Sequence, residues 1–279
     1  MFRQRQNKVF VLLSGVLLTA GLFSQPARNV ENDPVLEKVL EKARQLGVPP
    51  IYVRETFSRP EVARREKVIE RFNAPYEAKP YDQYRKIFIT PGRIEGGVVF
   101  LREKRKLIDA VSRKYGVDPF LLVSLAGVES NYGNSHKEYS VFNALYTIAY
   151  NYPRRSSWAA GELAQFLSWC YKDSLDPFSI YGSYAGAFGF GQFIPSSYNH
   201  YAVDFDGDGV RRPYDWPDVL GSMANYLVKN GYDSDSTDFS RKSKNWKAIY
   251  AYNHSENYVN VILELREEIK KKDSVTKKP

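Results

Sequence analysis

The sequence predicts a mostly α-helical protein. Apolar residues recur at the three- and four-residue spacing of amphipathic helices through most of the chain after residue 33. Asp-Pro pairs at residues 33–34 and 118–119 place a capping side chain and a proline where helices commonly begin. Strand patterns are few and short. With 279 residues, the chain is long enough for one large domain or two modest ones with a real core.

The expected helices are separated by segments rich in glycine, proline or acidic residues. The first helix covers residues 34–46, begins after Asp33 and ends at Gly47. A second, highly charged helix is expected at 59–72, whereas the tyrosine-rich segment 75–91 is expected to be extended or looped. Further helices are expected at 101–115, 120–130, 140–150, 157–171, 217–230 and 256–271, with a glycine-rich stretch at 181–191 and an acidic loop at 204–218.

This pattern divides the chain into four regions. They are a signal peptide or N-terminal anchor at 1–25, an N-terminal helical region at 26–96, the main helical core at 97–270, and a basic tail at 271–279 that we expect to be disordered.

The first region has the features of an export signal. Arg3, Arg5 and Lys8 precede an apolar run at 9–23. This run is shorter than the roughly 20 residues of a comfortable membrane span. The cleavage site is poorly defined, so an uncleaved inner-membrane anchor is the alternative. No cysteine lies nearby to carry a lipid.

Composition argues against several classes of function. The formal charge of +8 would suit a polyanionic partner, but part of it lies at the chain ends and no nucleic-acid-binding motif stands between them. We therefore expect no nucleic-acid partner. The single cysteine, Cys170, lies in an apolar run and is expected to be a buried small side chain rather than a catalytic thiol. Three scattered histidines, His136, His200 and His254, lack the spacing of a zinc site.

Glu129 is the candidate catalytic residue. In the helix expected at 120–130 it shares a face with the apolar residues three, four, seven and eight positions before it. Burying a charged carboxylate on such a stripe costs roughly several kcal/mol unless the group is paired or protonated. Such surroundings favour the protonated form that a general acid needs near neutral pH. The alternative is a glutamate at a helix end whose side chain simply reaches solvent.

Six short motifs follow one another from Glu129 to Tyr258. In chain order they are Glu-Ser-Asn-Tyr-Gly at 129–133, Tyr-Asn-Tyr-Pro-Arg-Arg at 150–155, Gly-Ser-Tyr-Ala-Gly-Ala-Phe-Gly-Phe-Gly-Gln-Phe at 182–193, Pro-Ser-Ser-Tyr at 195–198, the acidic loop, and Tyr-Asn-His-Ser at 252–255 followed by Tyr258. In order and approximate spacing across residues 81–265, they resemble the membrane-bound lytic murein transglycosylase B family of lysozyme-like lytic transglycosylases.

The resemblance implies a lysozyme-like α-helical core with a small β or loop element. It implies cleavage of the β-1,4 bond between N-acetylmuramic acid and N-acetylglucosamine in peptidoglycan without water, leaving a 1,6-anhydromuramic end. Glu129 would act first as the acid and then as the base. Ordinary glycosidases need two carboxylates, and no motif places a second Asp or Glu beside Glu129. A hydrolytic lysozyme of the same fold and a non-catalytic wall-binding scaffold remain alternatives.

Matching motif positions also imply which side chains line the cleft. Ser183, Gln192 and Asn253 would be polar groups there, and the glycines before Gln192 would let the backbone approach a sugar. Five aromatic residues would stack on sugars or donate hydroxyl groups, with core packing as the alternative for each: Tyr84, Tyr152, Trp158, Tyr252 and Tyr258.

The partner implied is the glycan strand of peptidoglycan, bound by a monomer without an organic cofactor. Because peptidoglycan lies outside the cytoplasmic membrane, we expect an exported protein. Its location would be the bacterial periplasm or, if the signal stays attached, the outer face of the inner membrane.

The acidic loop carries a calcium-binding pattern. Aspartates at positions 1, 3 and 5 with a glycine at 6 match the front half of an EF-hand loop. Position 12 is Asp215, whereas in the resembled family a longer loop closes with an acid at position 15, here Asp218. Helix capping is the alternative for either of these two acids. The implied set for a structural Ca²⁺, with Asp215 undecided, is Asp204, Asp206, Asp208, the Val210 carbonyl and Asp218.

Overall fold

The computed structural model describes residues 29–73, 79–135 and 138–275. Within these ranges the protein is mostly helical, with one short antiparallel strand pair. The elements in chain order are α1 (Pro34–Gln45), α2 (Pro50–Phe57), α3 (Glu66–Asn73), α4 (Tyr81–Phe88), α5 (Pro91–Glu103), α6 (Arg105–Tyr115), α7 (Pro119–Ser130), β1 (Tyr139–Ser140), α8 (Val141–Asn151), α9 (Pro153–Lys172), β2 (Tyr181–Gly182), α10 (Pro195–Tyr201), α11 (Trp216–Lys229), α12 (Lys244–Tyr252) and α13 (Glu256–Val275). The signal or anchor expected at 1–25 lies outside the described residues.

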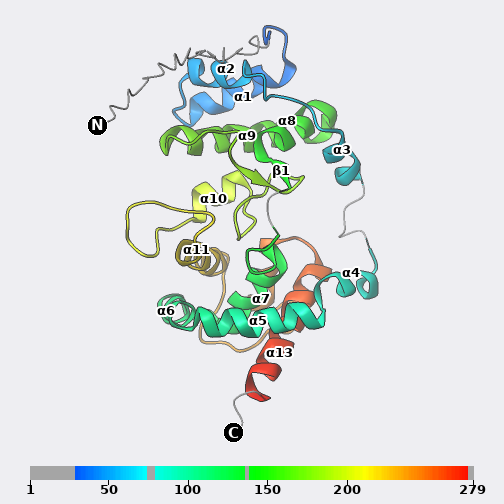
Figure 1. Ribbon diagram of the computed structural model, residues 1–279, viewed down its shortest axis with the longest axis vertical. Helices are drawn as coiled ribbons and strands as arrows, with labels where there is room; N and C mark the ends of the chain where they lie inside the picture. The colour runs from blue at the N-terminus through cyan, green and yellow to red at the C-terminus, as the bar shows by residue number, and fades with distance from the viewer. Residues whose placement is uncertain (1–28, 74–78, 136–137, 276–279) are drawn as a thin grey trace, which may run out of the picture.

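Helices α1, α2, α8 and α9 form one layer of the molecule, at the top of Figure 1. α1 begins where the sequence predicts, because the Asp33 carboxylate accepts hydrogen bonds from the N–H groups of Val35 and Leu36 at 2.9 and 3.3 Å. The apolar stripe of α1 is buried, and α1 packs against α9 and α2. The second oxygen of Asp33 accepts a hydrogen bond from the buried phenol of Tyr146 at 2.7 Å, so the same residue ties α1 to α8.

Helix α7 is the centre of the other half, where it packs against α5, α6, α11 and α13 (Figure 1). Residues 121–127 of α7 are all buried, as expected for a helix that is apolar around its circumference. Asp118 caps its N-terminus by accepting a hydrogen bond from the Leu121 N–H at 2.8 Å. The helix ends after Ser130, where Asn131 adopts a left-handed backbone conformation. The helix therefore ends one residue after Glu129.

The strand pair connects the end of α7 with the glycine-rich stretch. Tyr139 lies opposite Gly182 in the antiparallel pairing of β1 and β2. After β2 the chain folds back on itself, because Phe188 forms bridges with Gly182 and with Phe193. A Cβ on Gly133 would lie 3.3 Å from the ring of Phe190, so the turn after α7 is in contact with this stretch.

The structure corrects the predicted pattern in the N-terminal region. Residues 50–57 form α2, which is not among the expected helices. The charged helix predicted at 59–72 begins only at Glu66. The segment 75–91 contains α4 rather than only loop, because Tyr81 and Arg85 bind Glu264 of α13 and fix this short helix.

Other helix boundaries also differ from those that the sequence predicts. The helix predicted from residue 101 begins at Pro91, inside the region assigned to the N-terminal part, and is interrupted at Lys104 between α5 and α6. Helix α13 continues to Val275, so residues 271–275 of the tail predicted to be disordered are helical. The short helices α10 and α12 were not predicted.

Two further observations concern the helices and the cysteine. Within the described ranges, no helix has both the length and the apolar composition needed to cross a bilayer.

Cys170 is fully buried without a disulfide partner, and burial raises the pKa of its thiol. Its burial confirms the prediction of a buried small side chain.

Candidate active site

Glu129 stands on the last turn of α7 with its side chain half-buried. The turn that follows is held by Tyr132, whose phenol donates a hydrogen bond to the Arg93 carbonyl at 2.8 Å. A Cβ on Gly97 or on Gly127 would come within 2.6 Å of the Tyr132 hydroxyl. Helices α5 and α7 therefore approach closely around this ring, and their fit fixes the end of α7 at Glu129.

Tyr258 of α13 contacts Glu129 directly. Its phenol donates a hydrogen bond to Oε1 of Glu129, and only 2% of the residue is exposed. Burial, together with the negative charge of Glu129, raises the pKa of Tyr258 well above its ordinary value. The phenol therefore stays protonated and remains a donor to the carboxylate.

Tyr252 joins this group from the end of α12. Its ring is almost parallel to that of Tyr258, with 6.4 Å between centroids and 8° between planes. Its hydroxyl donates to the Gly191 carbonyl at 2.6 Å. Burial raises the pKa of Tyr252 and the charge of Glu129 adds to this effect. Tyr252 thus links Glu129 and Tyr258 to the glycine-rich stretch.

Ser183 and Gln192 hold that stretch in shape. The Ser183 hydroxyl oxygen accepts hydrogen bonds from the N–H groups of Ala185 and Ala187 at 3.3 and 3.2 Å. The Gln192 amide nitrogen donates to the Gly189 carbonyl at 2.8 Å. The backbone of Gln192 itself has a positive φ of 47°. Both residues are half-buried, so each keeps contact with solvent. Gln192 directly follows Gly191, whose carbonyl binds the Tyr252 hydroxyl.

The glycines of this stretch serve the protein's own packing. A Cβ on Gly182 would lie 2.0 Å from the Ala187 carbonyl oxygen. Gly189 has a φ of 76°, and a Cβ there would lie 2.5 Å from the Pro213 carbonyl oxygen. The expectation that these glycines serve to bring the backbone close to a sugar is corrected at both positions, because protein atoms fill the space.

Asn253 and Tyr84 complete the side of the site formed by α12, α13 and α4. Asn253 directly follows Tyr252, is half-buried, and accepts a hydrogen bond from the Ser255 N–H at its carbonyl oxygen at 2.7 Å. Tyr84 is 1% exposed, packs on Phe88 and adds to the raised pKa of Tyr258. With so little surface exposed, neither Tyr84 nor Tyr258 offers a ring face on which a sugar could stack, so the stacking expected of these two residues was wrong.

Tyr152 and Trp158 belong to the layer of α8 and α9. The Tyr152 hydroxyl lies 3.0 Å from both the Ile69 carbonyl and the Asn73 amide oxygen, and its ring packs on Phe72 with 4.7 Å between centroids. Trp158 is half-buried against the hydrophobic core. Tyr152 thus attaches α3 to α9, and the structure does not bring it into the group around Glu129.

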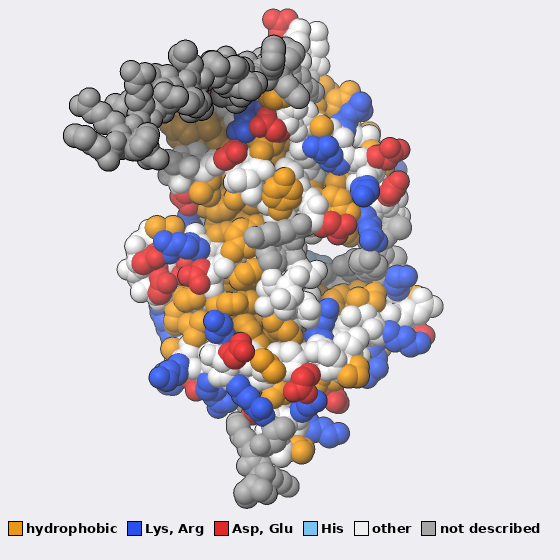
Figure 2. Space-filling view, in the orientation of Figure 1, with side chains coloured by type: hydrophobic (Ala, Val, Ile, Leu, Met, Phe, Trp, Pro, Cys, Tyr) orange, Lys and Arg blue, Asp and Glu red, His pale blue; other side chains and the backbone are white. Residues whose placement is uncertain are grey.

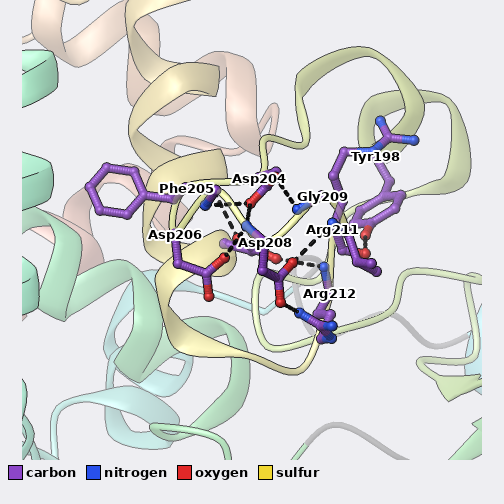
Figure 3. A network of polar contacts seen from close by, with 11 residues as sticks. Tyr198, Asp204, Phe205, Asp206, Asp208, Gly209, Arg211 and Arg212 are labelled. Atoms are coloured by element: carbon purple, nitrogen blue, oxygen red, sulfur yellow. Dashed lines mark hydrogen bonds and ion pairs between the residues drawn. The ribbon is translucent and has the colours of Figure 1, made fainter.

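The acidic loop gathers three carboxylates. Oxygen atoms of Asp204, Asp206 and Asp218 all lie within 4.8 Å of one another. Asp204 accepts hydrogen bonds from the N–H groups of Gly207 and Gly209, both at 2.7 Å (Figure 3). Partial loss of hydration raises the pKa of Asp206, and nearby carboxylates add to the shift. Such a concentration of hard oxygen ligands fits a divalent cation of the calcium type.

The acidic residues predicted as calcium ligands differ in how they are held in the loop. Asp218 is 2% exposed and accepts hydrogen bonds from the N–H groups of Phe205 and Arg212 at 2.8 and 2.7 Å, so it also closes the loop. Asp208 is directed at the Arg212 guanidinium instead of the cluster, which lowers its pKa (Figure 3). Asp215 precedes α11 without a capping hydrogen bond from its side chain. In this structure Asp208 therefore pairs with Arg212 and is not one of the three clustered carboxylates.

Sequence reasoning missed Arg266 of α13. This residue is 8% exposed and donates to both carboxylate oxygens of Asp118, at 3.2 and 2.8 Å. The sequence does contain a signal for this ion pair. Arg266 lies on the same apolar helical stripe as Ile262 and Ile269, and a cation buried there requires a partner of opposite charge.

Known proteins are similar to this chain in sequence and in fold. The family model described as a transglycosylase SLT domain matches residues 31–242. Membrane-bound lytic murein transglycosylase B of Escherichia coli (strain K12) is 43% identical over 150 residues, which are 54% of this chain and 42% of that protein. The match thus spans less than half the length of this curated relative.

Solved structures of lytic transglycosylases share the fold. The Escherichia coli lytic transglycosylase Slt35 in complex with calcium matches with a TM-score of 0.78 and 27% identity, covering 90% of this chain and 97% of that one. Soluble lytic transglycosylase SltB1 from Pseudomonas aeruginosa matches with a TM-score of 0.76 and 29% identity, covering 86% and 99%. Since the family model covers more than half of the sequence, the chain belongs to the transglycosylase SLT domain family.

Proposed function

We propose that this protein is a peptidoglycan lytic transglycosylase with Glu129 as its single general acid and base. It cleaves the β-1,4 bond between N-acetylmuramic acid and N-acetylglucosamine and leaves a 1,6-anhydromuramic end. The observation that carries the proposal is the buried phenol of Tyr258 donating to the carboxylate of Glu129 at the end of α7. Membership of the transglycosylase SLT domain family supports the reaction class.

The chemistry follows from one carboxyl group in two protonation states. Protonated Glu129 gives its proton to the glycosidic oxygen as the bond from that oxygen to C1 breaks. The N-acetyl group of the substrate stabilises the positive charge that develops at C1. The resulting carboxylate then takes the proton of the C6 hydroxyl as O6 bonds to C1, which restores the acid. Tyr258 stabilises the carboxylate between these two steps by donating to it.

The competing function is hydrolysis, which ordinarily uses a second carboxylate about 5–10 Å from the first. The sequence motifs place no second Asp or Glu beside Glu129. This favours a reaction in which the substrate's own C6 hydroxyl, rather than an activated water, attacks C1.

Product masses distinguish the two reactions. We expect soluble fragments released from purified sacculi to be lighter by one water than those a lysozyme releases. Fragments with only reducing ends would refute the transglycosylase reaction and support hydrolysis.

Ser183, Gln192 and Asn253 are proposed to bind the glycan beside Glu129. Ser183 accepts two backbone hydrogen bonds, which leaves its hydroxyl proton directed elsewhere. Gln192 donates from its amide nitrogen to Gly189, so its side-chain oxygen can accept a hydrogen bond from a sugar hydroxyl. Tyr252 connects the stretch that carries both residues to the site, since its hydroxyl holds Gly191.

We also propose that the acidic loop binds Ca²⁺ in a structural role. Asp204, Asp206 and Asp218 would supply carboxylate oxygens and Val210 its carbonyl oxygen, while Asp208 would contribute once released from Arg212. The Escherichia coli Slt35 structure in complex with calcium supports this choice of ion.

The substrate also suggests a location. Peptidoglycan lies outside the cytoplasmic membrane, so a protein that cuts it must be exported. We infer a place in the bacterial periplasm, or at the outer face of the inner membrane if the apolar run at 9–23 remains attached.

A further inference from the structure

Arg212 stands at the ninth position of the acidic loop, counted from Asp204. In an EF-hand loop the side chain at this position supplies a calcium ligand, often through a water molecule. A guanidinium group cannot do so, because it only donates hydrogen bonds and carries a positive charge of its own. The chain therefore places a cation where the EF-hand pattern has an oxygen ligand.

The side chain of Arg212 is directed at the carboxylates of the loop. At the left edge of the molecule, where the loop lies, acidic side chains gather beside basic ones (Figure 2). The Arg212 guanidinium forms an ion pair with Asp208, at the fifth position of the loop (Figure 3). The hydrogen bond to Asp208 raises the pKa of Arg212, and the charges of Asp206 and Asp218 add to this shift. The guanidinium thus lies close to three of the acids that we propose as calcium ligands.

The backbone of the loop is held independently of this ion pair. The Asp204 carboxylate accepts hydrogen bonds from two glycine N–H groups of the loop, both at 2.7 Å. Asp218 accepts a hydrogen bond from the backbone N–H of Arg212 at 2.7 Å. Because 44% of the Arg212 side chain is exposed, the guanidinium can leave Asp208 for solvent while its backbone N–H stays on Asp218.

We propose that Arg212 competes with calcium for the acidic loop: its guanidinium compensates part of the loop's negative charge when no ion is bound, and Ca²⁺ must displace it from Asp208. The inference rests on the calcium site proposed above and assigns to that site a residue that weakens it. Two cations repel each other, so holding both the guanidinium and the ion beside Asp208 is unfavourable. The calcium affinity of such loops depends on the charge of their ligands, and Arg212 reduces the net negative charge by one.

Arg211 provides a matched control at the adjacent position. Its guanidinium lies over the ring of Tyr198, with 5.8 Å between Cζ and the ring centroid. Arg211→Gln and Arg212→Gln remove the same charge from neighbouring residues, but Arg212→Gln also removes the ion pair with Asp208. A comparison of the two variants therefore separates the local competition from the effect of net charge.

Calorimetric titration with calcium chloride, on protein freed of metal by a chelator, measures the competition. Arg212→Gln should bind Ca²⁺ about tenfold more tightly than the wild type, whereas Arg211→Gln should stay within about twofold of it. Unchanged or weaker binding by Arg212→Gln would overturn the inference, as would equal tightening in both variants. If none of the three proteins binds Ca²⁺, the calcium site itself fails, and the inference fails with it. If all three bind with the same Kd, the inference alone fails.

Melting curves test the role of the guanidinium when no ion is bound. In a chelator, Arg212→Gln leaves the loop carboxylates without their counter-ion, so it should melt at a lower temperature than the wild type and Arg211→Gln. Saturating Ca²⁺ should remove or reverse this difference, because the variant binds the ion more tightly and gains more stability from it. An Arg212→Gln protein that melts in chelator at the wild-type temperature or above it would show that the guanidinium does not stabilise the ion-free loop, and would overturn the inference.

Discussion

The phenol of Tyr258 donates a hydrogen bond to the carboxylate of Glu129, joining α13 to the last turn of α7. The same two helices are joined at the other end of α7, where Arg266 binds both oxygens of Asp118. Asp118 in turn caps α7 through the Leu121 N–H. Helix α13 therefore fixes both ends of the helix that carries Glu129, and the position of the carboxylate depends on residues far away in the sequence.

Replacing Tyr258 by Phe should lower kcat about tenfold or more while changing KM little. The variant loses the donor that stabilises the carboxylate between the two proton transfers, and a hydrogen bond to a charged group contributes about 1.5–3 kcal/mol. Steady-state rates on glycan strands measure the effect.

The matched control is Tyr146→Phe. Tyr146 is also buried and also donates to a carboxylate, that of Asp33, at 2.7 Å. This control should reduce the free energy of unfolding without changing kcat. Equal kcat losses in the two variants would mean that the contact of Tyr258 with Glu129 is only structural.

Stability should depend on pH through Glu162 of α9. Its buried carboxylate accepts hydrogen bonds from the N–H and the hydroxyl of Ser196 at 2.9 and 2.8 Å, and burial raises its pKa. A carboxyl group whose pKa is higher in the folded than in the unfolded state stabilises the fold at low pH. This contribution is lost as the pH rises through the folded-state value.

The free energy of unfolding of the wild type should therefore fall relative to that of Glu162→Gln as the pH increases from about 4 to 7. Urea unfolding of both proteins at several pH values measures this difference. Glu103→Gln, at an exposed position on α5, should show no such trend. The account would be contradicted if, with increasing pH, the wild type's free energy of unfolding rose relative to that of Glu162→Gln or kept a constant distance from it.

Calcium should raise the melting temperature, because an ion that binds only the folded state stabilises it by mass action, by about 2.7 kcal/mol at a hundred times Kd. Asp206→Asn should remove the shift, since Asp206 is an exposed member of the carboxylate cluster. Asp235→Asn, outside the loop, should keep it. Melting curves that respond to neither calcium nor a chelator would show that the loop is not a working site.

Local sequence signals predicted the parts of the fold that local interactions determine. The Asp-Pro pairs mark the starts of α1 and α7, because each Asp caps its own helix and each Pro fits the first helical position. Helix α4 escaped prediction because eight residues form a marginal helix alone. Its stability depends on Arg85 and Tyr81 binding Glu264, a residue about 180 positions away.

In the candidate site, too, the sequence predicted some positions correctly and missed contacts that depend on distant residues. Motif positions pointed to Glu129, Tyr252 and Tyr258, which the structure brings together. They also pointed to Tyr152, whose hydroxyl instead meets Ile69 and Asn73 of α3, a contact that no local pattern reveals. The pattern of the acidic loop could not show that Arg212, four residues after Asp208, would draw that carboxylate away from the cluster.

The measurement that tests the central claim most directly is release of soluble muropeptides by the Glu129→Gln variant. Glutamine keeps the shape of the side chain and can still accept the hydrogen bond from Tyr258, but it can neither give nor take the proton that the reaction needs. The account predicts a loss of about a hundredfold or more with an unchanged melting temperature, while Glu103→Gln keeps full activity. A Glu129→Gln enzyme that retains a substantial part of the wild-type rate would contradict it and place the catalytic acid elsewhere.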